Sequence, residues 1–383
     1  MIRKEAWERY QEEIKGTIQA YREEMGRNLS GQAKEWEGIV ADAVDRLREP
    51  VLKQRKMPLC YVHFSFLRVD LIRRDYRLLA QGMDERWYLD TEPAEAVTET
   101  RELLAPFDRL WDSLTGQSRK YAGYVNAYDI RSLMFEEKER IDRSIACLLR
   151  WGLRDWKERG LFAGVPFSRE WILKWGEYWG DSEMLLHVDW RSKGMDAWKE
   201  AVRTAGRRED ALVFGCWYKE ELKGTELKGQ DLRFSVFEKC SLKGIVFEGC
   251  NLEGSRFFGS RFEGCSFYGC CLTGADFSEC VFENVSFAGA ELAGAVFPAE
   301  SVPFLHLDPR QLQKVMLKQW DEEEQRRNWE KARSGQEEQR EQRDRQGQAD
   351  QQDQAERQRQ PEQQNQAERQ RKAERQNQQG RKL

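Results

Sequence analysis

The stretch from Cys240 to Gly259 reads CSLKG-IVFEG-CNLEG-SRFFG, four groups of five residues with a large apolar residue at the centre of each group. The same spacing continues without a gap from Leu212 to Phe297. A helix repeats every ~3.6 residues and a strand every ~2, so neither explains a period of five. A solenoid does, because each repeat buries one side chain against the next layer. The expected structural core is Leu232, Phe237, Leu242, Phe247, Leu252, Phe257, Phe262, Phe267, Leu272, Phe277, Phe282, Phe287, Leu292 and Phe297.

Two further positions in each group support this interpretation. A small residue such as Cys240 or Ser255 stands two places before most of the large residues, and glycine such as Gly244 usually stands two places after. The large and small side chains should point inward. Glycine permits the left-handed backbone angles that a corner requires. The chain is therefore expected to turn a corner every five residues.

These groups, for example Cys240 to Gly244 and Ala275 to Glu279, resemble those of the pentapeptide-repeat family. The resemblance implies a right-handed quadrilateral β-helix with four pentapeptides in each coil. The sequence supports a coil of this length, because reading every twentieth residue gives one column of leucines from Leu212 to Leu292 and one aromatic column from Trp217 to Phe297. Like residues stacked in register pack without steps. Neighbouring coils should lie about 4.8 Å apart.

Composition excludes several classes of protein. The chain has 383 residues and a net charge of only −4, which argues against bulk nucleic-acid binding and against a uniformly acidic surface. No apolar run approaches the ~18 residues that a membrane span needs. The first residues lack the apolar core of a signal peptide. We expect a cytoplasmic protein, which a dedicated machine could still export.

The region before the repeats should be α+β and mostly helical. Residues 1–55 read as two amphipathic helices, either a helical hairpin packed within the chain or a coiled-coil arm that grips a partner. Residues 56–205 read as an α+β domain with a small antiparallel meander, whose strands we place at 60–67, 76–80 and 86–89. Helices should return from Pro93 onward, with one strong apolar stripe between Ile130 and Leu149.

Tryptophan is concentrated late in this domain. Trp171, Trp175 and Trp179 are spaced four apart, which predicts one face of a helix that begins after Ser168. The simpler interpretation is a domain core. The alternative is an aromatic protein-binding surface, since tryptophan is enriched in binding hot spots. These three residues are the candidate protein-binding residues of the sequence.

Residues 206–300 form the predicted β-helix, whose first coil should be irregular because Gly215, Glu220 and Gln230 occupy small-residue positions. We expect the preceding domain to cover that coil. Residues 301–333 should form a capping helix that starts at Asp308 and Pro309, and such a helix could instead make a homodimer. Residues 334–383 are rich in Gln, Glu and Arg, and predict a low-complexity tail that is disordered or a lone helix.

The sequence contains no catalytic constellation, so we expect no enzyme and assign no catalytic, cofactor-binding or metal-binding residues. Five of the nine cysteines, Cys240, Cys250, Cys265, Cys270 and Cys280, occupy the inward small position of a repeat, where cysteine behaves as a small hydrophobe. The three histidines, His63, His187 and His306, are far apart in sequence. An unrecognised enzyme site in residues 56–200 is the remaining alternative.

Function should then lie on outer surfaces. The first hypothesis is a protein-binding scaffold or adaptor. Segments 64–68 and 86–90 resemble the leading domain of pentapeptide-repeat adaptors that load cargo at contractile injection machines, which implies an injection-system component or effector as partner. The second hypothesis is DNA mimicry directed at DNA gyrase, as in other members of the family. It requires an acidic face, and lysines and arginines such as Lys243 and Arg261 interrupt the acidic residues of the repeats.

Overall fold

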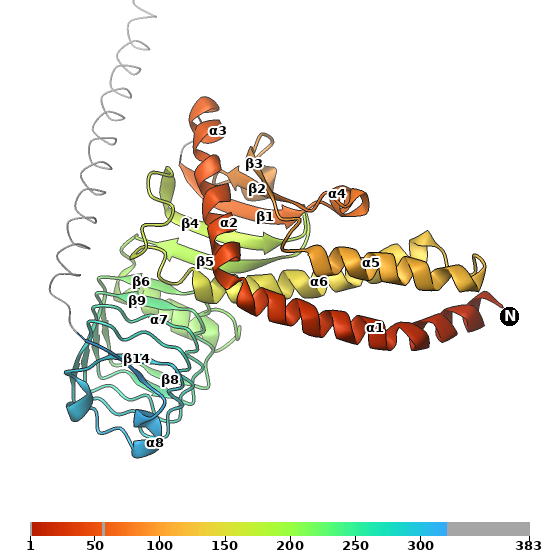
Figure 1. The fold of residues 1–383 in the computed structure, drawn as a ribbon. Coiled ribbons are helices and arrows are strands. Elements are labelled where there is room, and N and C mark those ends of the chain that lie inside the picture. The colour runs from red at the N-terminus through yellow and green to blue at the C-terminus, as the bar shows by residue number, and fades with distance from the viewer. Residues whose placement is uncertain (1, 56–57, 320–383) are drawn as a thin grey trace, which may run out of the picture. The chain divides into compact units, whose positions relative to one another are not determined.

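The computed structural model describes residues 2–55 and 58–319, which form an α+β region followed by a β-solenoid (Figure 1). The α+β region contains a five-stranded sheet with the order β3-β2-β1-β4-β5. Its strands are β1 (Leu59–Phe66), β2 (Arg77–Met83), β3 (Ala94–Glu99), β4 (Phe167–Gly176) and β5 (Ser182–Asp189). β1 pairs antiparallel with β2 and parallel with β4, so a meander and a hairpin join into one mixed sheet.

Helices cover one face of this sheet. The helices of the region are α1 (Arg3–Gly31), α2 (Ala33–Arg46), α3 (Arg48–Lys53), α4 (Arg68–Arg73), α5 (Ala105–Ser118), α6 (Ala127–Gly152) and α7 (Gly194–Ala205). Trp36 of α2 packs edge-on against Phe66 and Trp175 of the sheet. The indole nitrogen of Trp175 donates to Asp142 of α6 at 3.1 Å. Aromatic packing and one buried hydrogen bond thus fix α2 and α6 on the sheet.

The first helix packs away from the second. α1 lies along α5 and α6, and these three helices run side by side away from the solenoid (Figure 1). The hydroxyl of Tyr10 donates to the carbonyl of Leu114 at 2.8 Å, and Arg22 pairs with the buried Glu137 at 2.6 Å. Within the described residues α1 therefore forms an arm with α5 and α6, whereas α2 packs on the sheet.

Two predicted elements of this region are wrong. The segment from Ser168 is not a helix but lies in strand β4. Trp171 and Trp175 are four residues apart and would fit one face of a helix, but together with Leu173 they also occupy alternate positions of a strand. Pairing with β1 and β5 decides in favour of the strand. The predicted strand at 86–89 is a 3₁₀ turn, η1 (Trp87–Leu89), and the third strand of the meander is β3. The Ala and Glu residues of β3 have a higher propensity for helix than for strand, but pairing with β2 makes the segment a strand.

The solenoid has the expected twenty-residue register. Its short strands are β6 (Cys216–Tyr218), β7 (Glu221–Lys223), β8 (Glu226–Lys228), β9 (Val236–Glu238), β10 (Ser241–Lys243), β11 (Val246–Glu248), β12 (Arg261–Glu263), β13 (Val281–Glu283) and β14 (Val296–Pro298). β7, β10, β12 and β13 stack in parallel, so Leu222, Leu242, Phe262 and Phe282 form one column. Single bridges such as Asn251 to Cys271 continue the register on the leucine side.

Side chains fill the solenoid. Phe257 stacks on Phe237 and on Phe277 with ring centroids 5.0 and 4.8 Å apart, and Phe247 stacks on Phe267 at 4.9 Å. Leu252 and Leu272 are fully buried in adjacent coils. Every core residue named from the sequence is buried except Phe282, which is half-buried. The inside of the column therefore holds no cavity that could receive a substrate along these stacks.

The C-terminal end differs from the predicted capping helix. Asp308 caps a single turn, α8 (Pro309–Leu312), and the chain then returns to a strand, β15 (Met316–Lys318), which pairs in parallel with β14. Leu317 lies over Phe297, because the five-residue spacing continues beyond Phe297 as a partial coil. Leu305 is buried there and Phe304 is exposed. The rest of the predicted cap and the tail lie outside the described residues.

The stacked core predicts the effect of an inward charge. Phe257→Asp should unfold the solenoid, because it removes a ring that stacks on both sides and buries an unpaired carboxylate, a loss of about 4 kcal/mol or more. Urea unfolding followed by circular dichroism measures this loss. Tyr268→Asp is the matched control, because Tyr268 is 59% exposed in the neighbouring column. Equal stability of the two variants would contradict the fold.

Candidate functional site

The α+β region contacts the solenoid across a defined surface, here called the junction. A cavity of about 50 Å³ lies within it, lined by β5, the end of α6 and the first coils of the solenoid. Sites for small-molecule ligands usually measure about 300–1,000 Å³. The junction cavity can hold water but is too small for an ordinary substrate.

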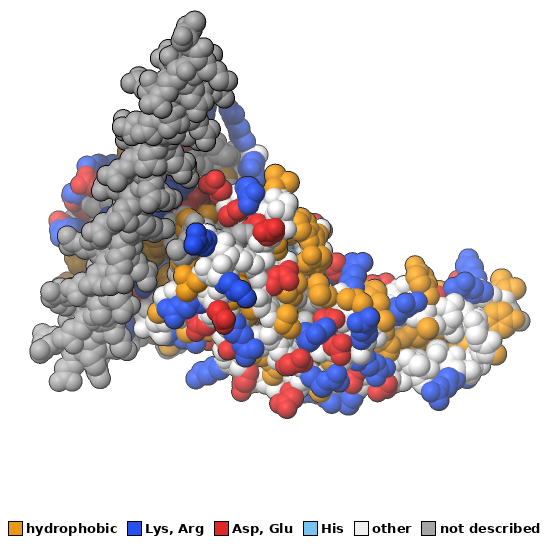
Figure 2. Space-filling view, turned by 90° about the horizontal axis from the view of Figure 1, so that it is seen from above, with side chains coloured by type: hydrophobic (Ala, Val, Ile, Leu, Met, Phe, Trp, Pro, Cys, Tyr) orange, Lys and Arg blue, Asp and Glu red, His pale blue; other side chains and the backbone are white. Residues whose placement is uncertain are grey.

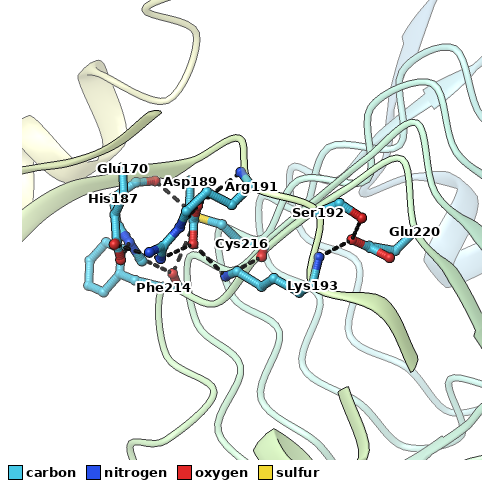
Figure 3. A network of polar contacts seen from close by, with 9 residues as sticks. All are labelled: Glu170, His187, Asp189, Arg191, Ser192, Lys193, Phe214, Cys216 and Glu220. Atoms are coloured by element: carbon cyan, nitrogen blue, oxygen red, sulfur yellow. Dashed lines mark hydrogen bonds and ion pairs between the residues drawn. The ribbon is translucent and has the colours of Figure 1, made fainter. Parts of the chain in front are cut away.

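A polar network holds one side of the junction (Figure 3). Asp189 at the end of β5 receives hydrogen bonds from Arg191 at 2.8 Å and from Lys193 at 2.9 Å. Arg191 also pairs with Glu170 of β4 at 2.6 Å. One ring nitrogen of His187 lies 2.9 Å from the carbonyl oxygen of Phe214, two residues before β6, the first strand of the solenoid. The network therefore ties the sheet to the start of the solenoid.

The charge of Asp189 is fixed by these partners. Burial alone would raise the pKa of Asp189, but hydrogen bonds from Arg191 and Lys193 outweigh it and lower the pKa well below its ordinary value. Lys193 also donates to the carbonyl of Cys216 in β6 at 2.8 Å. The aspartate is thus ionised, and it binds cations that already belong to this chain.

Glu220 explains one irregularity in the first coil. It stands where the repeat prefers a small residue, yet it is only 5% exposed. Its carboxylate accepts hydrogen bonds from the backbone N–H groups of Lys193 at 2.6 Å and Gly194 at 3.0 Å, at the N-terminus of α7. A carboxylate is stabilised at a helix N-terminus. As the sequence predicted, the preceding domain covers this coil.

The donor atoms of Glu170, His187 and Asp189 all lie within 4.8 Å of one another, a spacing that could suit a metal ion. Arg191 already bonds both carboxylates, and Lys193 bonds one of them. A metal ion would have to displace the guanidinium group of Arg191 from the two carboxylates. The positive charges of Arg191 and Lys193 would then lie unpaired beside the positively charged ion. The arrangement is better suited to an internal ion-pair cluster than to a metal centre.

A second part of the junction is centred on Arg256. Its guanidinium bonds Glu158 at 2.8 Å and the carbonyl of Arg154 at 2.7 Å, and it pairs with Asp276 of the next coil at 3.3 Å. Burial would lower the pKa of Arg256, but the two carboxylates raise it above its ordinary value. Removing one partner of a buried ion pair leaves the other charge unpaired and typically destabilises a protein by about 3–5 kcal/mol. This cluster therefore locks the two regions together.

Gly274, close to Arg256, lets the backbone of the solenoid approach Trp151 of the α+β region. A Cβ atom on Gly274 would lie 2.5 Å from the ring of Trp151, and Arg154 donates to the carbonyl oxygen of Gly274. Gly274 also has φ +62°, in the left-handed region. The α+β region thus rests directly on the solenoid backbone.

Five cysteines at the small inward position of the repeats are buried, and Cys240 illustrates their setting. The thiol of Cys240 lies against the carbonyl of Trp217 at 3.3 Å, and burial raises its pKa to about 12. Cys250, Cys265, Cys270 and Cys280 are also buried. A thiol held protonated, like that of Cys240, is a poor nucleophile. The five buried cysteines fill the small inward positions of the repeats.

Aromatic side chains form a second surface on the sheet face opposite α2. We call it the aromatic ledge, and its members are Tyr61, Trp87, Tyr88, Leu89, Tyr178 and Trp179. Successive rings lie close together, with centroids 4.4 Å apart for Tyr61 and Trp87, 4.5 Å for Trp87 and Tyr88, and 5.2 Å for Tyr88 and Trp179. Leu89 is 78% exposed and Trp179 is 49% exposed.

The ledge corrects the candidate binding residues. Trp171 and Trp175 are 2% and 1% exposed and belong to the core, because β4 turns them toward the helices. Trp179 lies beyond the end of β4 and remains exposed. Sequence reasoning missed Trp87, Tyr88 and Leu89, which lie about 90 residues away in the chain. The run Trp-Tyr-Leu between charged residues was the available signal, and it was assigned to a strand.

His63 lies beneath the ledge. It is fully buried, both of its ring nitrogens lack a hydrogen-bond partner among the described residues, and its ring is edge-on to Trp87 and Tyr88. Burial, with help from the nearby charges of Lys174 and Lys138, lowers the pKa of His63 to about 4. The histidine is neutral at pH 7.

Gly274 gives a test of the junction. Gly274→Ala should destabilise the chain by about 2–3 kcal/mol, because it adds a clash with Trp151 to the cost of a left-handed alanine. Gly264→Ala is the matched control, since Gly264 has the same φ of +62° and open space around it. Urea unfolding should show the control losing only about 1 kcal/mol. Equal losses would mean that Trp151 does not rest on the solenoid.

His63 gives a test of pH dependence. The unfolded state binds a proton near pH 6.5 and the folded state only near pH 4, so stability should fall as pH decreases from about 6.5 to about 4, by up to about 3 kcal/mol. His63→Phe should abolish this part of the pH dependence in urea unfolding. Its control is His306→Asn, at an exposed position. A wild-type slope that survives in His63→Phe would assign the loss to other groups.

Comparisons with known proteins find the repeat in part of the solenoid. Residues 237–281 match the family model described as pentapeptide repeats (9 copies). No curated protein matches the chain. Among the described helices, none combines the length and the apolar character that crossing a membrane requires.

Several solved structures of pentapeptide-repeat proteins are similar over part of the chain. Rfr23 from the cyanobacterium Cyanothece 51142 shares 19% identity over 20% of this chain and 58% of its own, with a TM-score of 0.14. The protein alr5209 from Nostoc PCC 7120 shares 17% over 33% of this chain and 99% of its own, with a TM-score of 0.18. QnrB1, a plasmid-mediated fluoroquinolone resistance protein, shares 21% over 27% of this chain and 64% of its own, with a TM-score of 0.13.

This chain thus spans 58% of the length of Rfr23 and 64% of that of QnrB1. The family match covers nine consecutive repeats, and the same residues stack in twenty-residue coils. Residues 237–281 therefore match pentapeptide repeats and lie within a β-solenoid.

Proposed function

We propose that the protein is a non-enzymatic scaffold that binds other proteins and holds the α+β region in a fixed position on the solenoid. The observation that carries this proposal is the junction. Across it, Arg256 of the solenoid pairs with Glu158, Glu220 accepts hydrogen bonds from the N-terminus of α7, and Lys193 donates to the carbonyl of Cys216, so contacts of several kinds hold the two regions together. Within the described residues, the core of the solenoid is filled by side chains, and the cavity at the junction, about 50 Å³, is too small for an ordinary substrate. Outer surfaces are left to perform the function.

The charges of the solenoid favour a scaffold over DNA mimicry. On its outer sides, acidic residues pair with basic residues one coil away: Lys243 with Glu263 at 2.6 Å, Lys228 with Glu248 at 2.8 Å and Arg261 with Glu283 at 3.0 Å. A DNA mimic needs a continuous row of negative charge. Figure 2 looks onto the α+β region rather than onto the solenoid, and acidic and basic side chains are interspersed on that face as well. We therefore rank gyrase binding second.

The finer part of the proposal concerns the partner. We propose an adaptor in the cytoplasm that docks or loads cargo, with a component or effector of a contractile injection or secretion system as its partner. The support is the resemblance of segments 64–68 and 86–90, of which the first lies in β1 and the second spans η1. A homodimer through the C-terminal end of the solenoid is compatible with the exposed Leu312 and Leu317 in its last partial coil.

A supercoiling assay and an affinity purification separate the two candidate functions. The scaffold proposal predicts no inhibition of DNA gyrase at about 10 μM protein, where mimicry by a complex of micromolar Kd or tighter would inhibit. It also predicts that the tagged full-length chain co-purifies a stoichiometric protein from the native host. Inhibition at low micromolar concentration, without a co-purifying protein, would reverse the ranking.

A further inference from the structure

We propose that the aromatic ledge is a docking surface for a basic peptide segment, one in which lysine or arginine lies next to large apolar side chains. This inference deepens the proposed function and depends on it, since it names one surface of the scaffold and the chemistry of its partner. It uses none of the residues of the junction.

The ledge is apolar and exposed where two distant loops meet. The loop at 84–90 carries Trp87, Tyr88 and Leu89, and the loop at 177–181 carries Tyr178 and Trp179. The hydroxyl of Tyr88 donates to the carbonyl of Gly180 at 3.2 Å, which joins the loops. Leu89, Trp179 and Tyr178 remain 78%, 49% and 44% exposed. Aromatic residues gathered in this way are typical of the centre of a protein interface.

Each of the two loops contains a tryptophan with an unfavourable backbone conformation. Trp87 and Trp179 have φ of +58° and +55°, in the left-handed region that bulky residues avoid. Such a conformation costs of order 1–3 kcal/mol and persists only where surrounding contacts hold it. Trp87 is held by Tyr61, by Tyr88 and by the ammonium group of Lys174, which lies 4.7 Å from its ring centroid. The ledge is therefore preorganised, which reduces the entropic cost of binding.

Unpaired carboxylates flank the ledge on both sides. Glu85 lies two residues before Trp87, and Asp181 lies two residues after Trp179; both are exposed, and neither forms an ion pair with a described residue. Exposed acids of the solenoid such as Glu263 and Glu283 are paired instead. Of the basic residues near the ledge, Arg86 pairs with Asp84 and Arg68 with Glu177, and the ammonium group of Lys174 lies over the ring of Trp87.

This charge pattern selects the partner. Two free carboxylates on opposite loops attract lysine and arginine and repel acidic segments. Lys174 already lies over Trp87, so the exposed rings of Tyr178 and Trp179 are the ones that offer faces for arginine guanidinium groups and for apolar side chains. A neutral apolar segment would leave the carboxylates unused, and a nucleic acid would be repelled. A basic segment with apolar neighbours satisfies both features.

A random dodecapeptide display library, panned on the full chain, tests the surface directly. The proposal predicts enriched peptides with a positive net charge and at least one large apolar residue. Leu89→Ser and Trp179→Gly should each weaken binding of the leading synthetic peptide about tenfold in fluorescence anisotropy. Glycine suits the backbone at position 179, so that variant should keep its melting temperature. Tyr268→Ser, on the exposed solenoid, is the matched control and should bind normally.

Charge is tested separately. Glu85→Gln combined with Asp181→Asn should weaken binding about fivefold at low salt, and the difference should disappear above about 0.5 M salt. Glu300→Gln, at an exposed position on the solenoid, is its control. Failure to enrich peptides, enrichment of acidic peptides, or equal binding by the ledge variants would overturn the proposal. If host proteins then still co-purified with the chain, the scaffold function would stand with another surface.

Discussion

Stacking of like side chains at intervals of twenty residues is the interaction on which the structure depends. Each coil presents four large inward side chains, and the next coil covers them with four more in the same positions. The backbone follows the same register: the N–H of Leu252 donates to the carbonyl of Cys271 at 2.7 Å. Packing and hydrogen bonding therefore reinforce each other, so a residue that breaks one column disturbs two neighbouring coils.

A solenoid built in this way has ends that its own repeats cannot cover. At the N-terminal end, α7 and the sheet cover the first coil, and Glu220 joins the helix terminus to the repeat. Trp198 of α7 is fully buried there and packs edge-on to Trp217 at 5.0 Å. The last described coil is different, since Leu317 and Leu312 continue the columns but are 54% and 43% exposed. The two ends of the described solenoid therefore differ, because the first coil is covered by the α+β region and the last one exposes apolar side chains.

The junction and the aromatic ledge have complementary roles in the proposed scaffold. Buried ion pairs are weak evidence for stability, since well-packed apolar residues often serve equally well. They do specify one orientation, because Arg256 finds Glu158 and Asp276 together only when the regions are docked as observed. The ledge lies on the opposite face of the sheet from α2 and takes no part in this contact. A partner on the ledge would thus be held in a defined position relative to the solenoid.

The sequence by itself determined the solenoid, because a period of five is local and each repeat packs against its own copy twenty residues later. It also indicated that the first coil is covered, and that the cysteines are core residues. Only the tertiary structure decided that the segment around Trp171 and Trp175 is a strand, since a spacing of four fits a helical face and alternate strand positions equally well. The tertiary structure also brought Tyr88 next to Trp179, with Glu85 and Asp181 exposed in the same two loops. Those contacts join residues about 90 positions apart through a mixed sheet, and no local pattern encodes such a pairing.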